Sequence, residues 1–234
     1  MATYKEISGF NIKSLATDPS NLLEGEIWYN STSGTLKVSP LVAGSWASGG
    51  NLTTARRNLG GAGIQTAALA IGGEAPQTGK TESYDGSTWS EVGDLNTARN
   101  TLGATGTQTA AIAFGGESLT TATETWDGSS WTTSPNSLNT AIRTNAGFGT
   151  TAAAVNFGGL TSPGARTAGT ETWDGSSWTT SPNSLPAATS NMGGFGISTA
   201  GVECGGSAPG VTGVSNEWGG SSWTSGGTMV TART

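Results

Sequence analysis

The chain has 234 residues, of which 132 are Gly, Thr, Ala or Ser, only 11% are charged, and the net charge is −6. The absence of His excludes catalysis by a His base and metal binding by imidazole. Ten dispersed Lys and Arg residues provide no basic surface for nucleic acid, and a single Cys cannot form an internal disulfide. Neither a secretory signal nor an apolar run of roughly 20 residues is visible, so we expect no membrane insertion. Nine Trp residues in a chain made mostly of small residues predict an ordered β protein with a Trp-anchored core.

Residues 1–45 form a segment that differs from everything after it. It holds three of the four Lys residues and the aromatic residues Tyr4, Phe10, Trp28 and Tyr29. We expect strands near 26–30 and 35–42, and a third near 45–50. An isolated two-stranded hairpin is marginal in water, so Trp28 and Tyr29 need a partner surface. That surface is either the rest of this chain or another protein, and we regard the four aromatic residues as candidate attachment residues.

Residues 46–234 are dominated by an internal repeat of 42 to 47 residues. Each repeat contains a Gly-Gly pair followed by a Glu-x-aromatic triplet, a turn and then a Trp. The Gly pairs begin at Gly72, Gly115, Gly158 and Gly205, and the repeat Trp residues are Trp46, Trp89, Trp131, Trp178 and Trp223. Self-similarity at such a period indicates a repeat architecture.

One repeat predicts four short strands. In the second repeat, the first strand covers 101–107 and the second runs from 109 into the Gly pair. The third carries Glu124-Thr125-Trp126, and the fourth carries Trp131. Asp127-Gly128 between the last two suits a tight reversal. Apolar residues alternate along the second strand, which is typical of a sheet packed on one face.

The order of Arg, apolar strand, Gly-Gly, Glu-x-aromatic-Asp and Trp resembles the kelch repeat, over about residues 52–234. This resemblance implies an all-β, kelch-like β-propeller of four repeat units. The repeats depart from the kelch pattern in their Gly, Thr and Ala enrichment, in a fourth unit without the opening Arg, and in a third strand there contracted to Glu217-Trp218.

A second resemblance concerns the N-terminal segment. Asp18-Pro19-Ser20 and Glu24 to Lys37, with Trp28-Tyr29-Asn30 at their centre, look like a short hairpin found near the N-termini of tailed-phage virion proteins, particularly marine ones. Followed by kelch-like repeats, this hairpin resembles phage structural or tail-fibre-like proteins. That resemblance implies a virion location, and neither composition nor periodicity indicates it.

The number of blades depends on how the ring closes. Five repeat Trp residues accompany only four Gly-Gly strands, and Thr231-Ala232-Arg233 resembles the opening of another unit. We expect five blades, with the first built from both chain ends, because closure removes exposed sheet edges. The alternative is four blades, with residues 1–45 outside the ring as an arm.

The residues that resemble catalytic or metal-binding groups have structural interpretations. Glu82, Glu124, Glu171 and Glu217 recur once per repeat, whereas a glycosidase needs one carboxylate pair. We expect them to form a structural ladder with Arg56, Arg99 and Arg143. Cys204 replaces apolar residues of the other units and is expected to be a small buried hydrophobe. We interpret Asp127 and Asp174 as turn residues rather than calcium ligands.

Two further features bear on binding. The connections after the Gly pairs, at 74–80, 117–122, 160–168 and 207–213, vary in length, and variable loops on a repeat scaffold often bind partners. They equally suit tolerant surface loops. Trp89, Trp131, Trp178 and Trp223 are expected to be buried structural anchors, because equivalent positions in successive units do not suggest a ligand platform.

The resemblance to tailed-phage proteins, together with these structural interpretations of the acidic residues, implies a non-enzymatic virion structural protein. It would be a fibre, decoration or adhesion module, multimeric in the particle, that binds other virion proteins and presents the propeller for protein or host-surface binding. A host-glycan receptor-binding protein is the alternative, and a glycan-cleaving enzyme is the least favoured. We expect no catalytic, cofactor-binding or metal-binding residues.

Overall fold

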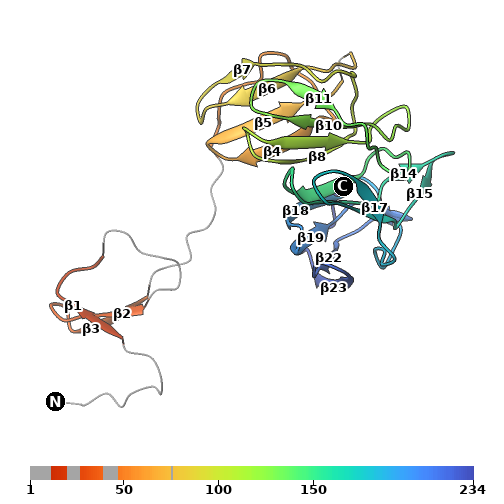
Figure 1. The fold of residues 1–234 in the computed structure, drawn as a ribbon. Coiled ribbons are helices and arrows are strands. Elements are labelled where there is room, and N and C mark those ends of the chain that lie inside the picture. Colours follow the sequence, from red (N-terminus) through yellow and green to blue (C-terminus); the bar gives the residue numbers. More distant parts are fainter. Residues whose placement is uncertain (1–11, 20–26, 39–46, 75) are drawn as a thin grey trace. The chain divides into compact units, whose positions relative to one another are not determined.

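The structure is a computed structural model that describes residues 12–19, 27–38, 47–74 and 76–234, and strands are its regular elements (Figure 1). The chain divides into two compact units, Met1–Ser48 and Gly49–Thr234. This division lies three residues after the boundary expected from the sequence. Within the described ranges, no helix has the length and apolar character needed to cross a membrane.

The N-terminal unit contains one three-stranded sheet. Strand β2 (Ile27–Asn30) lies between β1 (Lys13–Leu15), to which it is parallel, and β3 (Thr35–Val38), to which it is antiparallel. The expected hairpin is therefore present and gains a third strand from residues that precede it. This extra strand matters because two strands alone are marginally stable.

The repeat unit contains four antiparallel sheets of four strands, which we call blades 1 to 4. Blade 1 is β4 (Gly60–Ile64), β5 (Ala67–Ile71), β6 (Thr81–Tyr84) and β7 (Trp89–Glu91). Blade 2 is β8 (Gly103–Gly106), β9 (Ala111–Phe114), β10 (Thr123–Trp126) and β11 (Trp131–Thr133). Blade 3 is β12 (Ala146–Gly149), β13 (Ala154–Phe157), β16 (Thr170–Trp173) and β17 (Trp178–Thr180). Blade 4 is β18 (Gly193–Ile197), β19 (Ala200–Cys204), β22 (Val214–Trp218) and β23 (Trp223–Thr228).

The variable connections carry additional structure in the last two blades. A two-stranded ribbon of β14 (Leu160–Thr161) and β15 (Ala165–Arg166) follows the Gly pair of blade 3. A second ribbon, β20 (Ser207–Ala208) and β21 (Gly210–Val211), takes the same place in blade 4. Two of the four variable connections therefore contain small hairpins.

The Gly pair at the end of each second strand is required by the backbone. Gly115 and Gly116 have φ values of 67° and 129°, a region that residues with a Cβ rarely adopt. The N–H group of Gly116 donates to the carbonyl oxygen of Ile142 at 2.8 Å, which ties blade 2 to the segment that opens blade 3. The pair therefore turns the chain and joins consecutive blades.

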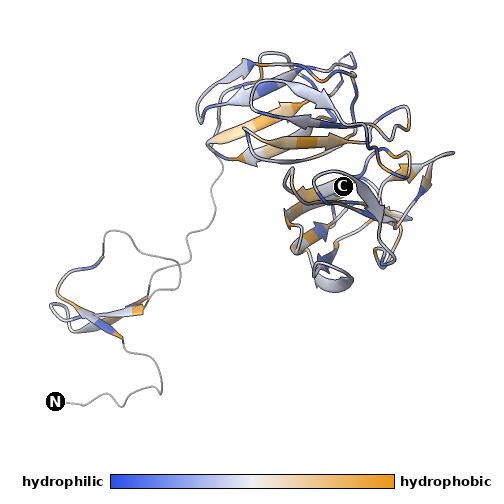
Figure 2. Ribbon diagram, viewed as in Figure 1, coloured by the Kyte–Doolittle hydropathy of each residue, from blue (hydrophilic) through white to orange (hydrophobic). Residues whose placement is uncertain are grey.

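Apolar side chains pack between consecutive blades, and those on the second strands of blades 1 to 3 are among the most deeply buried. Figure 2 shows by colour where hydrophobic residues lie along the strands. All four residues of β9 are buried. Glycines in the first strands let neighbouring blades approach closely: a Cβ on Gly147 would lie 2.5 Å from Cζ of Phe114 in the preceding blade. Small residues and interblade aromatic rings together explain how a chain so poor in large apolar residues forms a core.

The expected fifth blade, built from both chain ends, is not formed by the described residues. Strands β2 and β3 pair with each other and with β1, and residues 229–234 contribute no strand. The alternative, four blades with a separate N-terminal segment, agrees with this strand pairing. The reason is local: the side chain of Asp18 accepts hydrogen bonds from Asn30 and Lys37, which holds β2 and β3 within their own unit.

Candidate functional site

Three of the repeat Trp residues join consecutive blades. Trp131, Trp178 and Trp223 are buried, and the indole N–H of each donates to a Thr hydroxyl on the third strand of the preceding blade. The acceptors are Thr81 at 3.0 Å, Thr123 at 2.9 Å and Thr170 at 2.9 Å, in that order. These three Trp residues are the buried anchors that the sequence predicts.

Trp89 differs from these three Trp residues, and the remaining repeat Trp, Trp46, lies outside the described residues. It is half-buried, packs on Tyr84 with ring centroids 4.8 Å apart, and donates no hydrogen bond to another described residue. Trp89 lies in blade 1, which has no preceding blade among the described residues. The expectation of a fully buried anchor is therefore wrong at this position.

A buried Glu on the third strand caps the segment that opens each of the first three blades. Glu82, Glu124 and Glu171 are at most 4% exposed. Each accepts a backbone N–H bond of 2.7 or 2.8 Å from the opening segment of its own blade; the donors are Thr53, Asn96 and Asn139. The carboxylates thus accept hydrogen bonds from backbone N–H groups of the opening segments. Buried polar groups need such partners, and here the N–H groups and the carboxylates provide them for each other.

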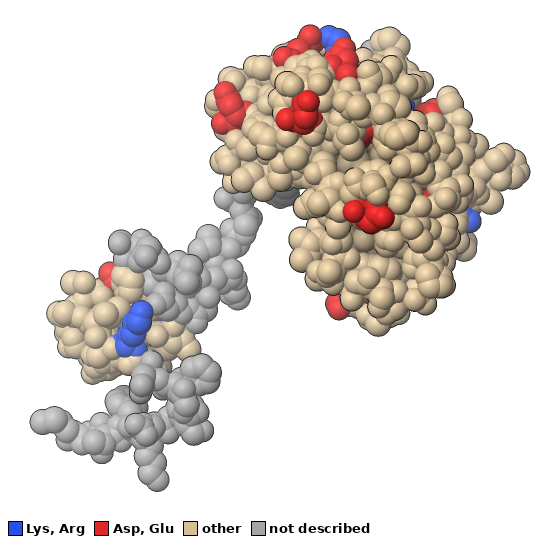
Figure 3. All heavy atoms as spheres, in the orientation of Figure 1, with Lys and Arg blue, Asp and Glu red and all other residues tan. Residues whose placement is uncertain are grey.

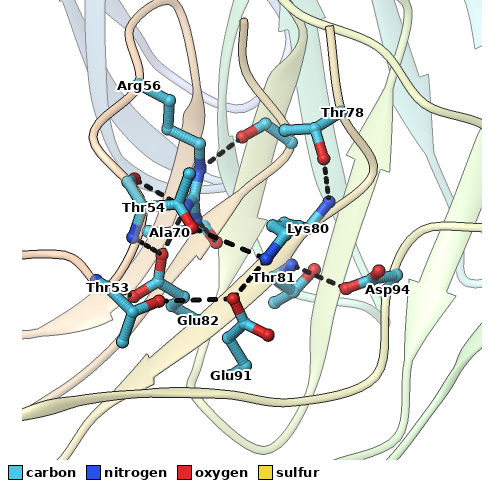
Figure 4. Close-up of polar contacts among 11 residues, drawn as sticks. Thr53, Thr54, Arg56, Ala70, Thr78, Lys80, Thr81, Glu82, Glu91 and Asp94 are labelled. Carbon is cyan, nitrogen blue, oxygen red and sulfur yellow. Dashed lines mark hydrogen bonds and ion pairs between the residues drawn. The ribbon is translucent and has the colours of Figure 1, made fainter. Parts of the chain in front are cut away.

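Figure 4 shows the first of these networks, in which Glu82 receives the guanidinium of Arg56 as well as the Thr53 and Thr54 N–H groups. Arg56 also donates to the carbonyl oxygens of Gly72 and Ala70. Burial alone raises the pKa of Glu82, but these hydrogen bonds and the charge of Arg56 outweigh it, so the pKa lies below its ordinary value. Glu82 is therefore a structural carboxylate that stays ionised.

The predicted Arg–Glu ladder covers two blades rather than three. Arg99 forms a buried pair with Glu124 at 3.1 Å, as Arg56 does with Glu82. Arg143 instead pairs with Glu117 at 2.8 Å on the surface, because Ile142 occupies the place of Arg99 in blade 3. Arg143 lies one residue after the position that Arg99 holds in blade 2.

Blade 4 has a different buried polar pair, and the expected role of Glu217 is wrong. Strand pairing places Asn216 where the other blades have Glu, and Glu217 one residue later, where it is exposed. Pro186 lies where Asn139 provides an N–H group in blade 3, so a carboxylate there would lack its backbone donor. The buried carboxylate of blade 4 is Glu203, which accepts a 2.7 Å bond from Asn216; burial raises the pKa of Glu203.

The Asp side chains of the tight turns accept hydrogen bonds from N–H groups of the same turns. Oδ1 of Asp127 accepts the N–H groups of Ser129 and Ser130, each at 2.8 Å, and Asp174 makes the same contacts two and three residues on. These hydrogen bonds, led by the backbone N–H of Ser130, lower the pKa of Asp127 to about 2. The predicted turn role is thus what the contacts show, and each carboxylate already serves as an acceptor for its own loop.

Two shallow hollows lie beside the variable connections of blades 1 and 2. The first, of about 510 Å³, is lined by Arg57, Glu74 and Gln77 among others, and Arg57 pairs with Glu74 at 2.9 Å. The second, of about 420 Å³, is lined by Glu117, Leu119 and neighbouring Thr residues. Neither hollow has an aromatic residue in its lining, and Figure 3 shows only scattered charged side chains on the visible face of this unit. These surfaces suit polar contacts rather than a deep substrate site.

Two of the candidate attachment residues, Tyr4 and Phe10, lie outside the described residues. Trp28 is only 3% exposed, and its indole N–H donates to Asp18 at 3.0 Å, so this ring belongs to the core of the N-terminal unit. Tyr29 is half-buried. An attachment role for the unit stays a prediction, in which Trp28 supports the fold rather than a partner contact.

Cys204 is half-buried rather than buried. Burial, followed by the nearby charge of Glu203, raises the pKa of its thiol, which favours the unreactive protonated form. Its counterparts Phe114 and Phe157 are fully covered by a following blade, and Cys204 has no following blade among the described residues. Cys204 and Trp89 are thus partly exposed for a similar reason: among the described residues, Cys204 has no following blade and Trp89 has no preceding blade.

The solved structure of YjhT, a kelch-repeat β-propeller protein, is similar to this one. The TM-score is 0.64, the match covers 77% of this chain and 68% of that chain, and 11% of the aligned residues are identical. No family model and no curated protein matches the sequence. The four-stranded antiparallel sheets thus resemble the blades of a kelch propeller, as the repeats predict.

Proposed function

We propose that this chain is a non-enzymatic structural protein of a tailed-phage virion, in which the N-terminal unit attaches to other virion proteins and the propeller blades are presented outward. The absence of an enzymatic function is supported by the structural role of the recurring carboxylates. Glu82, Glu124 and Glu171 are buried and each accepts a backbone N–H bond from an opening segment, so we do not assign them as the acid and base of a hydrolase.

The attachment part is supported by the division of the chain. The N-terminal unit has its own sheet and its own polar network around Asp18, in which the carboxylate is paired with Lys37 at 3.2 Å. The hydrogen bond from Asn30, followed by those from Trp28 and Lys37, lowers the pKa of Asp18 and keeps it charged. A self-contained unit that precedes a repeat scaffold suits attachment, and its hairpin resembles those of virion proteins.

The experiment for attachment compares the full chain with a chain that lacks residues 1–48. Antibodies against the repeat unit would be used for immunogold labelling of particles of a tailed phage that encodes this chain. We expect labelled particles with the full chain, and none with the shortened chain, although the latter remains folded by circular dichroism. Labelling that survives the deletion, or a shortened chain that unfolds, would contradict the attachment role.

The experiment for the absence of catalysis incubates the full chain with a panel of bacterial capsular and lipopolysaccharide glycans. No release of reducing ends is expected. Turnover that Glu124→Gln abolishes at temperatures where the variant is still folded would refute the proposal. The hollows beside the variable connections offer no feature that favours glycan binding over protein binding.

A further inference from the structure

The hollow beside the connection of blade 2 is formed by parts of three consecutive blades. Its lining comes from the opening segment of blade 2, at 97–99, from the connection 117–121, and from Ala141 in the opening segment of blade 3. Gln77, in the connection of blade 1, completes the lining, and its side-chain amide donates to the carbonyl oxygen of Ala98 at 2.7 Å. All parts of this hollow therefore lie within blades 1 to 3, away from both ends of the repeat unit.

Arg99 belongs to this lining and has hydrogen-bond donors without partners. Its side chain is 1% exposed, and Nη2 contacts the carbonyl oxygen of Ala113 at 3.4 Å and the carboxylate of Glu124 at 3.1 Å. Nε and Nη1 are buried and have no hydrogen-bond partner among the described residues. Because unpaired donors of a buried charged group are costly, two further acceptor oxygens would stabilise this side chain.

Arg56, the counterpart of Arg99 in blade 1, shows which acceptors suit these two nitrogens (Figure 4). Its Nε donates to the carbonyl oxygen of Gly72 at 2.8 Å, and its Nη1 donates to the carbonyl oxygen of Thr54 at 3.3 Å as well as to Glu82. Nε and Nη1 of Arg56 thus use backbone oxygens of two different residues. In blade 2 the matching carbonyl oxygens accept no hydrogen bond from Nε or Nη1 of Arg99.

The charges around the hollow favour an uncharged ligand. Arg99 is paired with Glu124, and Glu117, which lies in the lining, is paired with Arg143 at 2.8 Å. Each positive charge is therefore balanced, and an anion in the hollow would lie close to the carboxylate of Glu117. A carbonyl oxygen accepts hydrogen bonds without adding charge. An extended peptide supplies such oxygens on successive residues, with a rise of about 3.3 Å per residue, whereas an N-acetyl sugar supplies only one.

We propose that this hollow binds an uncharged peptide segment of a partner protein, in which two neighbouring backbone carbonyl oxygens accept hydrogen bonds from Nε and Nη1 of Arg99. The segment takes the place that carbonyl oxygens of the chain itself hold at Arg56. Thr97, Ser118 and Thr121 also line the hollow, and their hydroxyl groups can both donate to and accept from a peptide backbone. This partner site does not require that the chain be a virion protein.

Entry of the peptide requires a shift of the connection 117–122, because Arg99 is almost fully covered. Gly116, immediately before this connection, lies against the aliphatic part of Arg99: a Cβ on Gly116 would lie 3.3 Å from Cβ and Cδ of Arg99. Ser118 and Leu119 have φ values of 71° and 51°, a region that residues with a Cβ adopt only at a cost. Another backbone conformation of this connection therefore relieves strain while it uncovers Arg99.

The first experiment titrates the full chain with a panel of short capped peptides that lack charged residues, and follows nitrogen–proton NMR spectra. The Nε–H signal of Arg99 is assigned by its loss in Arg99→Lys. We expect a peptide to shift this signal together with the backbone amide signals of 117–121. The Nε–H signal of Arg56 should not shift, because Arg56 already has its acceptors.

Two matched substitutions locate the site. Ala98→Trp fills the hollow of blade 2, and Ala55→Trp places the same side chain at the matching position in the hollow of blade 1; both Ala residues are exposed. We expect Ala98→Trp to weaken binding at least about tenfold and Ala55→Trp to leave it unchanged, with both variants folded. Arg99→Lys keeps a positive charge beside Glu124 without the guanidinium and should also weaken binding about tenfold or more, as for loss of a hydrogen bond to a charged group. If Arg99→Lys unfolds, the two Trp variants still test the site.

Three further ligands distinguish a peptide from other occupants. They are glucose, which has only hydroxyl and ether oxygens, N-acetylglucosamine, which has one carbonyl, and sodium acetate at constant ionic strength. None should shift the Nε–H signal of Arg99. A shift with either sugar would indicate a glycan site, a shift with acetate an anion site, and no shift with any ligand would mean that water alone pairs with Arg99.

Each of these three results would overturn the peptide site, as would peptide binding that Ala98→Trp leaves unchanged. All are measured on the isolated chain, without phage particles and without glycan turnover. Failure of the peptide site is therefore distinguishable from failure of the proposed function.

Discussion

The indole N–H of Trp178 donates to the hydroxyl oxygen of Thr123 at 2.9 Å, although 55 residues separate them along the chain. Trp178 is on the outer strand of blade 3, and Thr123 begins the third strand of blade 2. The ring of Trp178 also packs edge-on against Phe114, with centroids 5.0 Å apart. One side chain thus provides both the apolar contact and the polar contact between two blades, and the same arrangement recurs at each interface.

The Trp–Thr hydrogen bond can be separated from the burial of the Trp ring. Trp131→Ala is expected to lower the free energy of unfolding by about 3–5 kcal/mol, as for other buried aromatic residues. Trp131→Phe and Thr81→Val each remove the hydrogen bond but keep most of the side chain. Each should therefore lower the free energy of unfolding by about 1 kcal/mol. Urea denaturation of both variants and of the double variant measures the coupling between them. Additive single effects would mean that the bond contributes nothing.

The buried carboxylates should matter for stability much more than the exposed ones. Glu124→Gln leaves Arg99 without its charged partner in a buried place, and a loss of about 3 kcal/mol is expected. Glu117→Gln, which breaks the surface pair with Arg143, should cost less than about 1 kcal/mol. Equal melting temperatures for the two variants would contradict the structural role of Glu124.

Glu203→Gln is expected to stabilise the protein at neutral pH. Burial raises the pKa of Glu203 above its usual value of 4.5, so ionisation costs more in the folded than in the unfolded chain. Below pH 4.5 both states are protonated and the variant has no advantage. Its advantage grows as the pH rises through the folded-state pKa, to the order of 1 kcal/mol. Melting temperatures at pH 4 and pH 7.5 provide the test, with Glu91→Gln as the exposed control.

The turn carboxylates make the opposite contribution to the pH dependence. Hydrogen bonds from Ser130 and Ser129 lower the pKa of Asp127 from 3.8 to about 2. Its stabilising effect is therefore complete above pH 3.8 and is lost as the pH falls towards 2. The double variant Asp127→Ala/Asp174→Ala should be less stable at pH 6 and should lose less stability between pH 4 and pH 2. An unchanged acid slope would show that other groups dominate it.

Much of the site could be predicted because each blade repeats the same local chemistry. The Gly pair, the turn Asp and the capping Glu each satisfy the backbone of nearby residues, so their types and spacing carry the information. The exceptions are single-residue shifts. Ile142 lies where blade 2 has an Arg, and Asn216 lies where the other blades have a Glu. In both cases the next residue along the chain is of the expected type, Arg143 and Glu217. Only the strand register distinguishes Arg143 from Ile142, or Glu217 from Asn216.

The sequence by itself determined the all-β class, the four-stranded blade and the buried role of Trp131 and Trp178, because periodic burial and turn chemistry are local properties. How many blades adjoin, and which of their faces stay open, was decided by the tertiary structure alone. That outcome depends on which strands pair at the two ends of the chain. Residues 27–38 pair within their own sheet, where Trp28, Asn30 and Lys37 donate hydrogen bonds to Asp18, so they do not complete a fifth blade. Trp89 and Phe195 are consequently left without the neighbours that their repeats provide elsewhere.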